Sequence, residues 1–254
     1  MKILKSIAVA FSMYSRIPMP RFEWGSEDMK YHLIFFPFIG VVIGALEYGW
    51  LLLSGYLSIS HLVFALIAVI IPVVVTGGFH VDGFMDTSDA LASWGDKEKR
   101  LAILKDSHVG AFAIIRFLTL GVIVFSSVFT MKEKGFFAWC FSFFIARAVS
   151  GICVVRNKKA KSEGSLFTLS QTADEKIVMC GLALEVLACA ILAEYYFEWY
   201  WICGLAALLL ALINYLYTAT TKFGGITGDL AGWFVCRAET FMAVAIAIFS
   251  LFQR

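Results

Sequence analysis

Long apolar runs separated by short polar segments dominate this chain. A helix needs about 20 residues to cross a bilayer, and most of the runs reach that length. The second and the last are short, which favours tilted spans or spans continued by polar residues that face the bundle interior. The pattern predicts seven transmembrane helices, over residues 32–57, 61–76, 109–130, 135–155, 177–197, 199–219 and 239–252. We therefore expect an all-α, polytopic integral membrane helix bundle.

The composition agrees with this expectation. Sixty per cent of the residues are apolar and only 16% are charged, whereas soluble domains carry about 25% charged residues. The start, MKILKSIAVAFSMYS, has two lysines and a brief apolar stretch without a convincing cleavage site, so it predicts a retained helix at the membrane interface. The six cysteines form no CxxC pair and are interpreted as core residues. We expect a single membrane-embedded domain, 1–254.

The basic residues are distributed unevenly between the two sides of these spans. If the N-terminus is cytoplasmic, the inner segments hold 16 of the 21 lysines and arginines and the outer segments hold 3. This bias predicts a cytoplasmic N-terminus and a cytoplasmic working face, because positive charge is retained on the inner side. The outer loops are very short, so nearly all polar residues lie on the inner side.

Three aspartates share one face of a short predicted helix. The segment GGFHVDGFMDTSD begins with two glycines that break the second span, and residues 82–92 then predict a helix. Asp82, Asp86 and Asp89 fall within about 60° of one another around its axis. Mg²⁺ takes carboxylate oxygens and bridges them to substrate phosphates. The stripe therefore predicts a divalent-metal site for phosphate chemistry, although Asp82 alone also suits a helix cap.

Other polar residues near this stripe are candidates for supporting roles. His80 either orients a carboxylate or moves a proton, or it is an ordinary interfacial histidine. In the segment KDSHVGAF, Lys105 is a candidate to meet a phosphate. Asp106 either takes part in substrate binding or caps the helix that follows.

Arg147 lies deep in the fourth span, where a charge is costly unless it has a partner. Its partner is expected to be either a phosphate-bearing ligand or an intramembrane acid, with Glu47 and Glu185 as the candidates.

A second glycine cluster, KFGGITGDLAG, precedes the last span. It lacks the GK[ST] of a P-loop, and it is either a plain loop or a phosphate-binding turn in which Gly225 and Gly228 allow close backbone approach. Asp229 follows directly and is a candidate to complete the metal site from a second segment.

Taken in order, the strings FSMYSRIPMP, FFPFIGVVIGAL, GGFHVDGFMDTSDAL, KDSHVGAFA and GGITGDLAG resemble the cobalamin synthase family of adenosylcobinamide-GDP ribazoletransferases. The matches cover residues 11–239, nearly the whole chain, and the GGxHxDGxxDTxDAL string is the most specific. The resemblance implies an inner-membrane, Mg²⁺-dependent enzyme that joins adenosylcobinamide-GDP to α-ribazole, or its 5′-phosphate, and releases GMP. The family often has Arg after the DS pair, where this chain has His108.

The resemblance points to His80, Asp82, Asp86, Asp89, Lys105, Asp106 and Asp229, and the pattern analysis adds Arg147, Gly225 and Gly228. The catalytic candidates are His80, Asp82, Asp86 and Asp89; the substrate-binding candidates are Lys105, Asp106, Arg147, Gly225 and Gly228; the metal ligands are Asp82, Asp86, Asp89 and Asp229. Either Asp89 or His80 would accept the proton of the attacking hydroxyl.

Two other functions remain open from the sequence. A CDP-alcohol phosphotransferase-like lipid enzyme also places spaced aspartates at helix ends, but its longer pattern is incomplete here. A divalent cation transporter should carry its ionisable residues near the bilayer midplane on broken helices, whereas here they gather at one mouth. The expected partners are the two small-molecule substrates and membrane lipid, with no nucleic acid, and the sequence allows a homo-oligomer.

Overall fold

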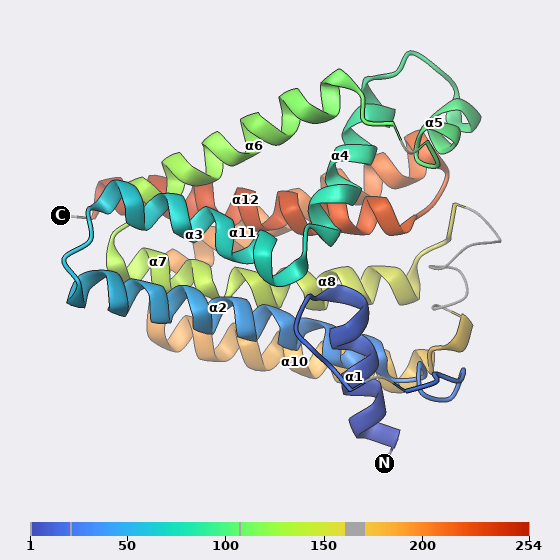
Figure 1. The fold of residues 1–254 in the computed structure, drawn as a ribbon, viewed down its shortest axis with the longest axis horizontal. Helices are drawn as coiled ribbons and strands as arrows, with labels where there is room; N and C mark the ends of the chain where they lie inside the picture. Colours follow the sequence, from blue (N-terminus) through green and yellow to red (C-terminus); the bar gives the residue numbers. More distant parts are fainter. Residues whose placement is uncertain (1, 21, 107, 161–170, 254) are drawn as a thin grey trace.

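The computed structural model describes residues 2–20, 22–106, 108–160 and 171–253. Most helices run along a common direction, with the short connections and the C-terminus at one end and the longer polar segments at the other (Figure 1). Apart from one parallel bridge between Lys159 and Ile226, these described ranges hold no β-structure. The predicted polytopic helical membrane bundle is confirmed.

The helix bounds follow the predicted spans closely, except near residues 135–155 and at the last span. The helices are α1 Lys2–Tyr14, α2 His32–Tyr56, α3 His61–Thr76, α4 Phe79–Ala92, α5 Lys97–Ile103, α6 Ala111–Thr130, α7 Glu133–Cys140, α8 Ser142–Arg156, α10 Glu175–Phe197, α11 Trp199–Thr218 and α12 Gly228–Phe252, with a π-helical turn at Ala219–Phe223. The pair α7 and α8 forms one span, and with α2, α6, α10, α11 and α12 it gives six spans of sufficient length and apolarity in the described residues.

The predicted span over 61–76 is helix α3, which is sharply bent against α4. Helix α3 ends at Gly77 and Gly78, which have φ angles of +62° and +81° that favour glycine. The chain turns by 96° between α3 and α4. Helix α4 therefore lies across the bundle near its polar end rather than along it (Figure 1), outside the spanning helices. It packs on α12 and α6.

The last helix begins earlier than the sequence predicted. The span was expected over 239–252, but α12 starts at Gly228. Thr227 caps this helix, since its hydroxyl accepts a hydrogen bond from the backbone N–H of Leu230 at 3.2 Å. Asp229 consequently lies in the first turn of a long helix and not in a loop.

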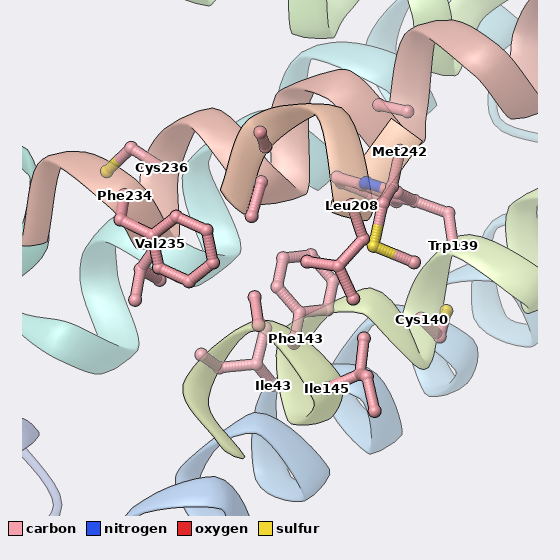
Figure 2. Packing of buried hydrophobic residues seen from close by; sticks show 14 of the residues in the cluster. Ile43, Trp139, Cys140, Phe143, Ile145, Leu208, Phe234, Val235, Cys236 and Met242 are labelled. Carbon is pink, nitrogen blue, oxygen red and sulfur yellow. The ribbon is translucent and has the colours of Figure 1, made fainter. Parts of the chain in front are cut away.

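The core is formed where α2, α7, α8, α11 and α12 meet. Figure 2 shows Phe143, Leu208 and Met242 converging from three of these helices, and Trp139 and Phe143 pack with ring centroids 4.7 Å apart.

Two glycines bring α2 unusually close to the α7–α8 span. A Cβ added to Gly44 would lie 2.6 Å from the carbonyl oxygen of Cys140, and one added to Gly40 would overlap the backbone of Phe143. Small residues spaced four apart are a common contact between membrane helices.

We expect Gly40→Ala to destabilise the bundle by about 1–3 kcal/mol, because the methyl group must displace the backbone of α8. The measurement is thermal unfolding of the purified protein in detergent. Gly49→Ala is the matched control on the same helix, since nothing lies within 4 Å of its added Cβ. Equal unfolding temperatures for Gly40→Ala and the unmodified protein would contradict this account of the contact.

Candidate active site

The backbone of α4 packs directly against the backbone of the first turns of α12. A Cβ added to Gly83 on α4 would lie 2.8 Å from the carbonyl oxygen of Asp229 and 2.9 Å from its Cα. A Cβ added to Gly232, one turn further along α12, would lie 3.1 Å from the carbonyl oxygen of His80. No side chain separates the two helices at these positions. The acidic face of α4 is thereby fixed beside the start of α12.

This crossing gathers all four predicted aspartates into one acidic site: Asp82, Asp86, Asp89 and Asp229. Asp82 is exposed and the other three are half-buried. The pKa of Asp86 is raised to about 6, first by burial and then by the charges of Asp82, Asp229 and Asp89, in that order. The carboxyl group of Asp86 therefore interacts electrostatically with each of the other three carboxyl groups.

The described side chains of the acidic site do not form a complete coordination shell for a metal ion. Among the described residues, no group of three or more His, Cys, Asp or Glu side chains lies close enough together to hold one metal ion. The carboxylate of Asp89 lies directly against Gly110, where α6 begins, and a helix start favours negative charge. The donors themselves are the hard oxygens that Mg²⁺ prefers, and Mg²⁺ needs only one or two protein carboxylates when phosphates and water complete its shell.

His80 points away from the acidic site. Its side chain is 4% exposed and stacks on Phe36 with centroids 5.7 Å apart. Neither ring nitrogen has a hydrogen-bond partner in the described part of the chain, so no contact supports the predicted role of orienting a carboxylate. Sequence proximity to Asp82 is misleading here, because residues two apart on a helix lie about 200° apart around its axis.

Lys105 and Asp106 lie in the exposed connection between α5 and α6. Asp106 accepts hydrogen bonds from the backbone N–H of His108 at 3.0 Å and from its Nδ1 at 2.7 Å. The backbone bond is the main reason that the pKa of Asp106 lies below its usual range. The alternative that Asp106 caps the following helix is wrong, since Gly110 occupies that position.

Arg147 has an internal partner that the sequence did not single out. It donates to Oε1 of Glu239 at 2.6 Å and to the carbonyl oxygen of Phe143 at 2.7 Å, and it is 1% exposed. The predicted partners Glu47 and Glu185 are not the ones that it uses. This buried ion pair joins α8 to α12. Arg147 also lines a cavity of about 230 Å³, so its predicted role in substrate binding stays a prediction.

The glycine cluster before α12 uses its backbone donors internally. The N–H of Gly225 donates to the carbonyl oxygen of Ala219 and the N–H of Ile226 to that of Lys158, both at 2.9 Å. These two donors are therefore occupied, which does not support the predicted phosphate-binding role of Gly225. Gly228 differs, because it is exposed at the start of α12 with open space around its Cα.

Comparison of the sequence with known proteins shows the family of this chain. The model of the family described as cobalamin-5-phosphate synthase matches residues 6–247. A protein of Lachnoclostridium phytofermentans named adenosylcobinamide-GDP ribazoletransferase is 38% identical over 98% of this chain and 95% of its own length. Proteins of the same name from Clostridium perfringens strain 13 and Clostridium botulinum strain Alaska E43 are 32% and 33% identical, over 94% and 91% of this chain and 96% and 92% of their own lengths. No solved structure matches the chain. By these matches over nearly its whole length, the chain belongs to the cobalamin-5-phosphate synthase family.

Proposed function

We propose that this protein is an adenosylcobinamide-GDP ribazoletransferase. It joins adenosylcobinamide-GDP to α-ribazole, or to α-ribazole 5′-phosphate, and releases GMP. The observation that carries the proposal is the acidic site, in which four aspartates from α4 and α12 lie together at the polar end of a membrane bundle. A relative with this name matches 98% of this chain and 95% of its own length.

The acidic site suits a reaction at a pyrophosphate. Within the described residues, Asp82, Asp86 and Asp89 form no ion pair with lysine or arginine, so their negative charge stays available to a cation. We propose that Asp82, Asp86, Asp89 and Asp229 are the residues that would hold Mg²⁺. Bound Mg²⁺ supplies charge neutralisation for the pyrophosphate and for the departing GMP.

The chain's own residues position the reactants and take up the proton. A ribose hydroxyl of the acceptor attacks the phosphorus next to cobinamide, a P–O bond forms, and the pyrophosphate bond breaks to release GMP. Asp89, whose carboxylate lies against Gly110 at the start of α6, accepts the hydroxyl proton. Lys105, exposed on the α5–α6 connection, and the start of α12 at Gly228 provide positive charge and backbone N–H groups for phosphates.

The charge distribution supports the orientation of the site. The 16-to-3 excess of basic residues on the segments at the acidic end favours a cytoplasmic location for that end. We propose that the protein is integral to the cell inner membrane with the acidic site open to the cytoplasm, where nucleotide substrates are available.

Asp82→Ala should lower the rate of GMP release by at least about a hundredfold, because the pyrophosphate loses part of its charge stabilisation. The assay combines purified protein with adenosylcobinamide-GDP and α-ribazole, with Mg²⁺ or with EDTA, and detects GMP by chromatography. Glu23→Gln, which removes an exposed acid outside the site, is the control and should retain full activity. Near-normal turnover of a folded Asp82→Ala protein would refute the metal role, and release of CMP from a CDP-alcohol instead would favour the lipid enzyme.

Asp86→Asn should stabilise the metal-free protein at pH 8. The native carboxyl group has a pKa of about 6 against an ordinary 3.8, so the native state loses stability as the pH rises through this window. Asparagine removes both the buried charge and its repulsion. With EDTA present, we expect a higher unfolding temperature for Asp86→Asn than for the unmodified protein at pH 8, and convergence of the two as the pH falls toward 4. Identical unfolding temperatures at pH 8 would show that the four carboxylates do not repel one another as described.

A further inference from the structure

A cavity of about 210 Å³ lies between α1, α2, α4, α8 and α12, next to the acidic site. Three aromatic rings form one wall: Tyr14 packs against Phe36 with centroids 4.6 Å apart and against Phe79 at 5.6 Å. Gly228 and Gly232 of α12 also line the cavity. Since Gly228 is followed by Asp229, the cavity adjoins the place where the acidic site begins.

Like Ser150, His80 is a buried polar residue that lines this aromatic cavity, and the chemistry of its imidazole is unexplained. It is 4% exposed, stacks on Phe36 and meets Phe79 edge-on at 5.5 Å. Both of its ring nitrogens lack a hydrogen-bond partner among the described residues. Buried polar side chains nearly always have one, so an uncompensated imidazole at a cavity wall indicates a ligand atom. His80 also borders a second cavity, but the Arg147–Glu239 ion pair there is already made within the protein.

The cavity selects for a flat, apolar ring that carries one hydrogen-bond acceptor. Aromatic walls favour stacking with such a ring, and a neutral imidazole offers one N–H donor. A benzimidazole-type base joined to ribose has one unsubstituted ring nitrogen that accepts a hydrogen bond. A lipid acyl chain would fill apolar space but would leave both nitrogens of His80 unsatisfied.

We propose that this cavity binds the base of the ribazole acceptor, and that His80 donates a hydrogen bond to the unsubstituted ring nitrogen of the base. The inference rests on the proposed transferase function and gives His80 a role in acceptor recognition in place of proton transfer. With the base held between α1, α2 and α4, the ribose leaves the cavity past Gly228 toward Asp229. The attacking hydroxyl is then delivered to the acidic site.

The test compares two acceptors that differ at one atom, α-ribazole and the indole α-riboside in which a C–H replaces the unsubstituted ring nitrogen. The unmodified protein should use α-ribazole with a kcat/KM about tenfold higher, the effect expected of one buried hydrogen bond. In His80→Phe, kcat/KM for α-ribazole should fall about tenfold while that for the indole riboside stays unchanged, and the preference should vanish. The KM for adenosylcobinamide-GDP should not move. His80→Gln, which keeps an N–H donor, should retain part of the preference.

The controls separate this inference from the function on which it rests. His61→Phe removes a histidine that stacks on Phe64 and is the first residue of α3, at the end of that helix away from α4, and it should leave the preference intact. If the unmodified protein releases GMP with neither acceptor, the proposed function fails. If it releases GMP but shows no preference, or if His80→Phe keeps the preference or slows both acceptors equally, the assignment of the cavity is overturned. The first comparison needs no variant, so it holds even if His80→Phe does not fold.

Discussion

The contact between α4 and the first turns of α12 is the constraint from which the site follows. Gly83 and Gly232 leave no side-chain volume between the two helices, so backbone meets backbone. This proximity forces three aspartates of one helix toward a fourth on the other. Burial and, after it, the repulsion of the other three carboxylates raise the pKa of Asp86. Packing of the helices maintains an arrangement that the charges alone would disperse.

The division of labour around α4 follows from helical geometry. The face with Asp82, Asp86 and Asp89 carries the acidic site, whereas His80 lies on the side that enters the bundle beside Phe36. One short helix thus separates the acidic site from an apolar cavity. A substrate with a phosphate-accepting sugar and an apolar ring requires both environments next to each other. Aspartates for charge and an aromatic cavity for shape together match such a molecule.

Some of this arrangement can be predicted from the sequence because it depends on local spacing. The apolar runs predict the spans, and the interval of four and three residues between the aspartates predicts their shared face. The partner of Arg147 could not be predicted in this way, since Glu47, Glu185 and Glu239 are all acids in apolar surroundings and only the packing of α8 on α12 selects Glu239. The start of α12 was also missed. Three glycines close together are typical of a loop, yet Thr227 caps a helix that begins at Gly228.

The 25-residue length of α12 has a mechanical consequence. A helix this long adapts to thinner or thicker bilayers by changing its tilt. Asp229 lies at one end of this helix and α4 is attached to it through glycine contacts, so both move together as the tilt changes. A change in the tilt of α12 therefore also acts on the contact between Asp89 and Gly110 at the start of α6, because α4 packs on both helices.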